Sequence, residues 1–288
     1  METLLQQLFN GLTVGSVYSL VALGLTLVFG ILHIPNFAHG ALYMLGGYVT
    51  LTMMTSLGLH YWVAILLSML AVGLIAVLME RLIFHPLKDA PPLQDKIAAI
   101  GILLFLEALA QFIWGAEYKT MPTPYGQVIE IGGLTITLQR LLIVAAAIVI
   151  MIGLHLFLRK TMTGSSIIAM AQNRDGAFLV GINANKVAML TFLISGALAA
   201  IAASLAAPIN LVSPGMGHLV ILKAFVIIIL GGMGSIPGAI MGGYILGFTE
   251  SLGAAYISND YKDLIAFVLL VLILSIKPQG LFVKEGHS

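Results

Sequence analysis

Long apolar stretches make up most of the chain, and short segments between them hold most of the polar residues. The stretches fall at residues 8–31, 37–57, 61–80, 97–115, 140–158, 187–207, 219–231, 237–254 and 263–276. Apolar and polar residues do not alternate within them, so the pattern favours helices over strands. Because a membrane crossing needs about 20 helical residues, we predict an all-α, polytopic transmembrane bundle of about eight to nine crossings, which forms one domain over residues 1–288.

Two breaks between apolar stretches contain Gly or Pro. The first is His33-Ile34-Pro35-Asn36, and the second covers residues 231–238. Breaks of this kind often mark discontinuous helices beside a transport path, and they also occur as ordinary tight turns. If either neighbouring segment is partly re-entrant, the predicted number of crossings is eight.

Composition supports the membrane assignment. Of the 288 residues, 60% are hydrophobic and 9% are charged, whereas a soluble domain has roughly 25% charged residues. The mean hydropathy is +1.06, and too few charges remain to cover a water-facing surface. The net charge of +1 gives no basic face for nucleic acid, so no nucleic-acid partner is expected.

The basic residues predict an orientation, because short cytoplasmic loops of membrane proteins are enriched in Lys and Arg. Nine of the 13 basic residues lie in residues 81–96, in residues 159–186 or after residue 276. We place these three segments in the cytoplasm, and the amino terminus and residues 116–139 outside. The first basic residue is Arg81, so we expect no cleaved signal peptide and retain the first apolar stretch as a membrane helix.

Small residues are concentrated in several predicted helices. Residues 195–204 have little side-chain bulk, and the pairs Gly11/Gly15 and Gly238/Gly242 have small-xxx-small spacing. Helices in lipid associate through close backbone approach at such positions. The pattern predicts tight packing within the chain, and a dimer interface is the alternative.

The predicted cytoplasmic segment, residues 159–186, has a helical pattern of its own. Residues 165–172 are predicted to form a short helix, followed by a polar break and a second amphipathic turn that ends at Gly181. Helices on the cytoplasmic face could dock a soluble partner, or the segment could be a simple connector.

Three motifs make the chain similar to a known family. Residues 159–186 contain, in order, Gly164, Ala169, Asn173, Ala177 and Gly181-Ile182-Asn183. Residues 36–40 match an Asn-Phe-Ala-x-Gly signature, and Lys223-Ala224-Phe225 precedes a glycine-rich stretch at 230–239. Together these motifs resemble the permeases of branched-chain amino acid ABC importers, in particular the LivH-type subunits.

The resemblance implies a transport subunit, and not an enzyme, in a bacterial or archaeal cytoplasmic membrane. Its implied partners are a second related permease, cytoplasmic ABC ATPases and an extracytoplasmic substrate-binding protein. The sequence agrees on one point, since it contains no G-x-x-x-x-G-K-[ST] phosphate loop. Residues 159–186 would then be the ATPase-coupling segment, with Gly164, Ala169, Asn173, Ala177 and Gly181 as its characteristic residues.

Polar residues within the apolar stretches are candidates for a translocation path or gate. These candidates are Asn36, His39, Tyr43, Glu107 and Lys223. A structural role in hydrogen bonding or ion pairing is the alternative for each. Lys223, like Glu250, could also lie near a helix end and extend to the membrane surface. The seven histidines show no H-x-x-x-H spacing, so no metal site and no cofactor are expected.

The resemblance implies a branched-chain or other aliphatic amino acid as the substrate, and a largely apolar path with few charges is compatible with a zwitterion that has an apolar side chain. Urea or a short amide is an alternative substrate. A self-sufficient channel or ion-coupled carrier is an alternative class, and it would need several intramembrane charges that form an ion site. A membrane enzyme is disfavoured because no nucleophile, base or metal set clusters in the sequence.

Overall fold

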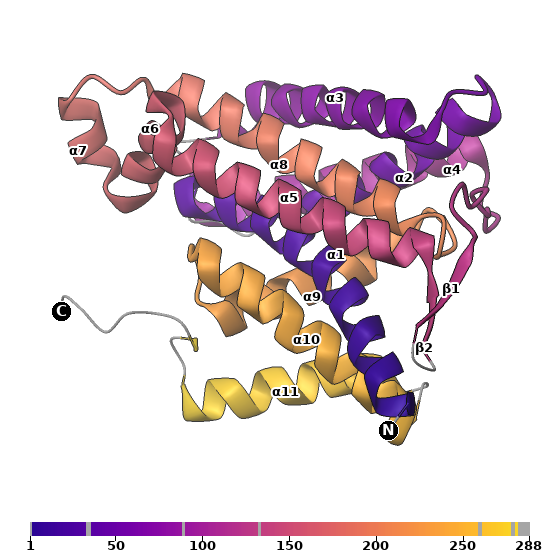
Figure 1. The fold of residues 1–288 in the computed structure, drawn as a ribbon. Coiled ribbons are helices and arrows are strands. Elements are labelled where there is room, and N and C mark those ends of the chain that lie inside the picture. Colours follow the sequence, from indigo (N-terminus) through magenta and orange to yellow (C-terminus); the bar gives the residue numbers. More distant parts are fainter. Residues whose placement is uncertain are drawn as a thin grey trace.

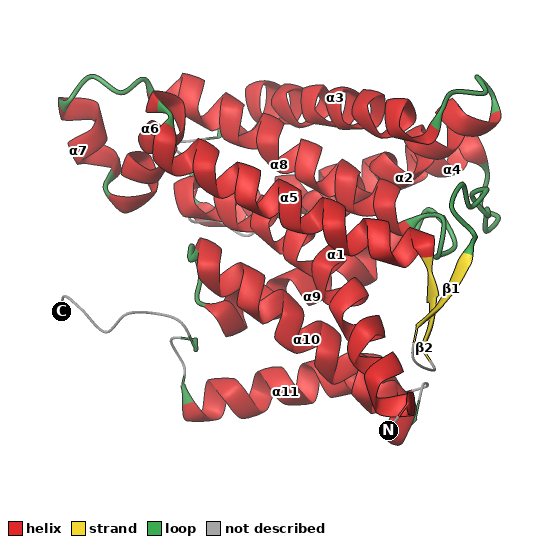
Figure 2. Cartoon of the chain, in the orientation of Figure 1, coloured by secondary structure: helices red, strands yellow, loops and turns green. Residues whose placement is uncertain are grey.

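The computed structural model describes residues 2–32, 36–87, 90–131, 134–258, 261–277 and 280–281. Helices account for most of these residues (Figure 2). The helices are α1 (Glu2–Leu32), α2 (His39–Thr55), α3 (Tyr61–Met79), η1 (Glu80–Phe84), α4 (Pro92–Trp114), α5 (Leu138–Lys160), α6 (Met162–Gln172), α7 (Arg174–Leu179), α8 (Ala184–Ala206), α9 (Met216–Gly231), α10 (Ile236–Tyr256) and α11 (Lys262–Ile276). The strands are β1 (Val128–Ile131) and β2 (Leu134–Thr137).

The described helices confirm a polytopic α-helical membrane fold. Within the described ranges, five helices are long and apolar enough to cross a membrane: α1, α3 with η1, α4, α5 and α8. The pair α9 and α10, bent by 119°, raises the number to six if it forms one span. Helices α2 and α11 have 17 and 15 residues, which is shorter than a typical crossing. The predicted eight to nine crossings are therefore not confirmed.

The predicted break at residues 231–238 is a tight turn between α9 and α10. Gly232 and Gly234 have φ angles of 95° and 83°, a left-handed conformation that glycine adopts without steric cost. The Ser235 side chain then accepts a hydrogen bond from the Gly238 amide at 3.1 Å and caps α10. The other break is described only from Asn36 onward, because His33, Ile34 and Pro35 lie outside the described residues.

A short β-hairpin, which the hydrophobic pattern did not predict, covers part of the 116–139 connection. Its strands pair in antiparallel register from Val128 opposite Thr137 to Ile131 opposite Leu134. Each strand has only four residues, too few for a clear two-residue period. Gln6, near the start of α1, binds the hairpin through a 3.1 Å hydrogen bond to the Thr135 carbonyl.

Helices α1 and α10 pack closely through glycines. A Cβ atom on Gly11 would lie 2.7 Å from the Phe248 ring, and one on Gly15 would lie 2.8 Å from the Tyr244 ring. The order of these contacts shows that α1 and α10 are antiparallel. Glycine therefore lets the two backbones approach more closely than any larger residue allows, and Gly11/Gly15 packs within the chain, as predicted.

Helix α8 lies against α1, α2 and α3, and its small residues admit polar contacts in the interior. Ser204 on α8 hydrogen-bonds Thr50 on α2 at 2.6 Å, and its carbonyl accepts from the Tyr61 hydroxyl on α3 at 3.0 Å. Gln139 donates to the same tyrosine oxygen at 2.9 Å. In lipid, such hydrogen bonds join helices that the hydrophobic effect alone does not hold together.

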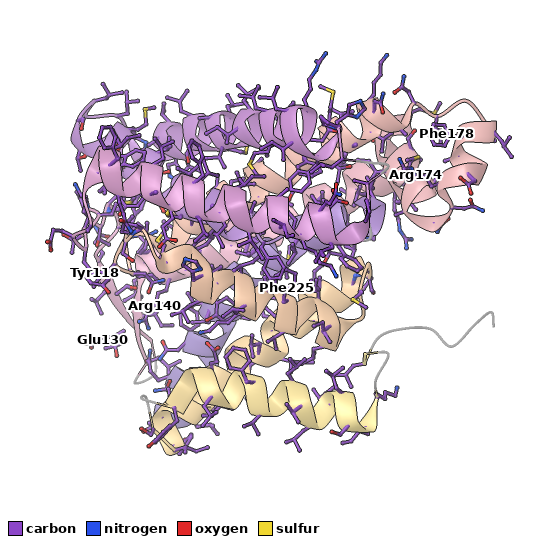
Figure 3. The ribbon with its side chains drawn as sticks, turned by 180° about the vertical axis from the view of Figure 1, so that it is seen from behind. Tyr118, Glu130, Arg140, Arg174, Phe178 and Phe225 are labelled. Carbon is purple, nitrogen blue, oxygen red and sulfur yellow. The ribbon has the colours of Figure 1, made fainter. Side chains whose placement is uncertain are left out.

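The bundle has two distinct ends (Figure 1). The start of α1 and the β-hairpin lie at one, which we call the hairpin end; α6 and α7 project at the opposite one, the α6–α7 end. In Figure 3, Arg140 lies at the hairpin end, and Arg174 and Phe178 lie at the α6–α7 end.

Candidate translocation site and coupling segment

A buried ion pair joins α9 and α10. The Lys223 Nζ atom lies 2.9 Å from Oε1 of Glu250 and 3.1 Å from its Oε2. Only 7% of Lys223 and 5% of Glu250 is exposed. The alternative in which both side chains extend to the membrane surface is therefore wrong, because each charge has a nearer partner than water.

Tyr18 on α1 completes this cluster. Its hydroxyl donates to Glu250 Oε2 at 2.8 Å and lies 2.8 Å from Lys223 Nζ, from which it accepts. The three side chains thus join three helices from distant parts of the sequence. Hydrogen bonds that satisfy the remaining sites of a buried ion pair are what make such a pair tolerable away from water.

The cluster lies at the wall of a cavity of about 360 Å³. Tyr43 on α2 also lines this cavity, together with Arg140 at the start of α5 and Asn10 on α1. The apolar part of the wall includes Val14, Val17, Val220 and Ala254. Ten of the fifteen described lining residues have polar side chains, and the cavity has the size of a small-molecule site.

A polar chain runs along the cavity toward the hairpin end. Arg140 donates to the Asn10 side-chain oxygen, and Asn10 donates to Gln7 Oε1 at 3.2 Å. Gln7 Oε1 also accepts from the Ser251 hydroxyl at 3.0 Å, and Ser251 is adjacent to Glu250. Hydrogen bonds therefore lead from Arg140 to the residue beside the ion pair.

His39 and Asn36 lie at or just before the start of α2, where His39 connects α2 to two other helices. His39 is fully buried; its Nε2 lies 3.0 Å from the Val21 carbonyl of α1, and its Nδ1 lies 3.2 Å from Ser195 Oγ of α8. Asn36 is also buried, and its Oδ1 accepts from the Ala38 amide at 3.1 Å. These contacts fit the structural alternative, in which both residues fix the junction before α2.

Glu107 is paired at a separate place. Its Oε2 lies 2.6 Å from His218 Nε2 on α9, and the side chains of Glu107 and His218 are 17% and 43% exposed. Neither residue lines the cavity described above. A charged or protonated Glu107 therefore has a hydrogen-bonding partner, as expected for an acid within a membrane helix.

Of the five predicted path residues, the structure brings together only Tyr43 and Lys223. Arg140, Asn10 and Tyr18 were not predicted, although they line the same cavity. Arg140 is a basic residue outside the three predicted cytoplasmic segments, and that unusual position was the available signal. Among the described residues, no group of three or more His, Cys, Asp or Glu side chains could hold a metal ion.

The predicted coupling segment contains the two expected helices, α6 and α7. Thr161 caps α6 by accepting from the Gly164 amide at 3.0 Å, and Asn173 caps α7 by accepting from the Gly176 amide at 2.8 Å. Side-chain oxygens at these positions satisfy amides that have no partner inside the helix. The polar break at Asn173 therefore ends one helix and starts the next.

The other characteristic residues of the coupling segment contribute to packing or to a turn of the backbone. Gly164 lies against the backbone of Phe157 and Leu158, where a Cβ atom would clash. Ala169 is half-buried, and Ala177 is 3% exposed. Gly181 follows α7 with a φ angle of 83°.

The exposed surface of this segment comes from other residues. Phe178, Leu179 and Val180 are 52%, 89% and 75% exposed, and all three are apolar. We call them the apolar tip. Their exposure at the α6–α7 end leaves an apolar surface without cover from the described residues, the kind of surface that often marks a protein–protein contact.

The chain matches a family model and several curated proteins. The model described as "Branched-chain amino acid transport system / permease component" matches residues 7–274. The high-affinity branched-chain amino acid transport permease BraD of Pseudomonas aeruginosa is 38% identical, over 96% of this chain and 95% of BraD. LivH of Escherichia coli K12 is 36% identical, over 96% of this chain and 94% of LivH.

More distant proteins agree with these matches. A probable LivH permease of Methanocaldococcus jannaschii is 31% identical over 91% of this chain and 87% of that protein. Among solved structures, PsaBC from Streptococcus pneumoniae, determined in complex with Fab, gives a TM-score of 0.50 over 97% of this chain and 93% of that chain. Sequence identity to PsaBC is 13%, so this likeness concerns the fold alone. The chain belongs to the permease family of branched-chain amino acid transport systems.

Proposed function

We propose that this chain is a permease subunit of an ATP-driven importer for branched-chain or other aliphatic amino acids. It would act in the cytoplasmic membrane of a bacterium or archaeon. Family membership supports the transport role. The observation that carries the assignment of an external energy source is the exposed apolar tip at the end of α7, which offers a docking surface at one end of the bundle.

The energy enters through the α6–α7 end. Separate ABC ATPases bind the apolar tip and move α6 and α7 when they bind and hydrolyse ATP. Helix α6 follows α5 directly at Thr161 and packs against α5, α8 and α1. A displacement of α6 is thus passed to membrane helices, which alternate between outward-open and inward-open arrangements.

The substrate enters at the hairpin end. An extracytoplasmic binding protein delivers the amino acid there, and a second related permease completes the path. The basic residues agree with this orientation, since Arg159 and Lys160 lie in the last turn of α5, near α6. Short cytoplasmic loops are enriched in such residues.

Reconstituted transport tests this function. The permease is purified with its native partner subunits, placed in liposomes and given ATP inside and the loaded binding protein outside. We expect uptake of labelled leucine, isoleucine and valine above uptake of urea and acetamide. Preferential uptake of urea or acetamide would replace the amino acid with a short amide as the substrate.

A further inference from the structure

The cavity at the hairpin end combines charges of both signs with an apolar wall. Its charged lining residues, among the described ones, are Arg140, Lys223 and Glu250. Lys223 and Glu250 neutralise each other at 2.9 Å, which leaves the cavity with an excess positive charge at Arg140. A cavity with an excess positive charge favours a ligand that carries a carboxylate.

Arg140 has capacity for such a ligand. Its described side-chain partner is the neutral Asn10 oxygen, and none of the described carboxylates forms an ion pair with it. A guanidinium group has five N–H donors in a planar fork that matches a carboxylate. Arg140 is also only partly buried, and it lines the cavity.

The inner cluster forms a neutral polar part of the cavity wall. Glu250 accepts from Tyr18 and Lys223 through Oε2, and Lys223 Nζ also lies 2.9 Å from its Oε1. Val14, Val17 and Val220 line the same cavity and suit an aliphatic side chain.

We propose that this cavity is the permease's own binding site for the transported amino acid, with the carboxylate at Arg140 and the aliphatic side chain against the valines. The inference rests on the proposed function. The cavity, at about 360 Å³, is at the lower end of the usual range for ligand pockets, about 300–1,000 Å³. That size suits one small molecule.

The test separates substrate handling from ATPase stimulation. The complete importer is reconstituted with wild-type permease, Arg140→Gln or Glu130→Gln, and leucine uptake and ATP hydrolysis are measured with the loaded binding protein. Glu130 is an exposed hairpin residue at the same end, so its variant controls for a changed charge on that surface. We expect Arg140→Gln to lower uptake about tenfold, the cost of one charge-assisted hydrogen-bond partner, while stimulated ATP hydrolysis and the Glu130→Gln control match the wild type.

A second variant keeps the test decisive if Arg140→Gln does not assemble. Val14→Phe fills the apolar side of the cavity and leaves Arg140 in place, and we expect the same loss of uptake with retained ATP hydrolysis. Wild-type leucine uptake by either assembled variant would overturn the binding site and leave the proposed function intact. Parallel loss of uptake and ATP stimulation would also overturn it, because the residue would then act in docking. Absence of leucine uptake by the wild type would overturn the proposed function and the site with it.

Discussion

Lys223 and Glu250, 27 residues apart, meet in the interior of the bundle, where Nζ lies 2.9 Å from Oε1. One comes from α9 and the other from α10, on either side of the 119° bend. Their contact therefore fixes the two arms of the bent pair to each other. Tyr18 adds α1 to the same cluster.

Removing one member of this pair should destabilise the fold more than removing both. Glu250→Gln leaves the Lys223 ammonium without its counter-charge, which typically costs about 3–5 kcal/mol. The double variant Lys223→Met/Glu250→Leu removes both charges, and its unfolding free energy should return most of the way to the wild-type value. Unfolding in detergent–denaturant mixtures measures both quantities. Equal losses in the single and double variants would show that the ion pair does not act as a unit.

The apolar tip should be needed for ATPase binding and not for membrane insertion. Leu179→Glu places a charge at a side chain that is 89% exposed, so the bundle itself should fold normally. If Leu179 is an interface anchor, its loss should weaken ATPase association about thirtyfold, which corresponds to about 2 kcal/mol. Co-purification of the ATPase with the permease provides the measurement.

The matched control for that variant is Tyr118→Glu, at the opposite end of the bundle (Figure 3). Tyr118 is 72% exposed, so the change in charge and exposure is similar. The control should bind the ATPase like the wild type. Normal ATPase binding by Leu179→Glu would exclude the apolar tip as the docking surface.

The glycine contact between α1 and α10 should be sensitive to size. Gly15→Leu pushes a side chain into Tyr244, because a Cβ atom alone would lie 2.8 Å from that ring. Overpacking of this kind costs about 1–3 kcal/mol. Gly101→Leu is the control, since a Cβ atom at Gly101 meets nothing within 4 Å. Thermal aggregation of the two variants in detergent should differ, and identical midpoints would contradict tight α1–α10 packing.

Removing the charge of Glu107 should leave the amount of inserted protein unchanged, whereas removing its hydrogen-bonding atoms should lower the stability of the protein. Glu107→Gln keeps an acceptor for His218 Nε2, now 2.6 Å from Glu107 Oε2, so the amount of inserted protein should not fall. Glu107→Leu removes that acceptor and should cost about 0.6 kcal/mol, with an upper limit of about 1.7 kcal/mol. The unfolding free energies of the two variants test this prediction, since Glu107→Leu should be the less stable. Gross loss of inserted protein with Glu107→Gln would show that the charge itself is structural.

The sequence predicted the features that depend on local pattern. Continuous apolar stretches gave the long helices, and the pattern of residues 165–181 gave two short helical segments separated by a polar break, which correspond to α6 and α7. The glycine-rich turn at residues 231–238 was also visible, because glycine is the residue that accepts positive φ angles.

Features that depend on contacts between distant segments were not predictable. The partnership of Arg140 with Asn10 joins residues 130 positions apart, and the sequence contains no sign of which helix faces which. Ala177 and Phe178 are neighbours, yet Ala177 is buried and Phe178 is exposed, so the spacing of the motif residues in this segment did not identify its outer surface. The β-hairpin was not predicted because its strands are too short to show a two-residue period in the sequence.

The most direct measurement compares leucine accumulation in liposomes that hold the permease pair alone with accumulation in liposomes that also hold the ATPases. With ATP and the loaded binding protein supplied, we expect accumulation against a gradient only when the ATPases are present, and loss of it when ATP is replaced by a non-hydrolysable analogue. Uphill accumulation by the permeases alone, driven by an imposed ion gradient, would contradict the account and identify an ion-coupled carrier.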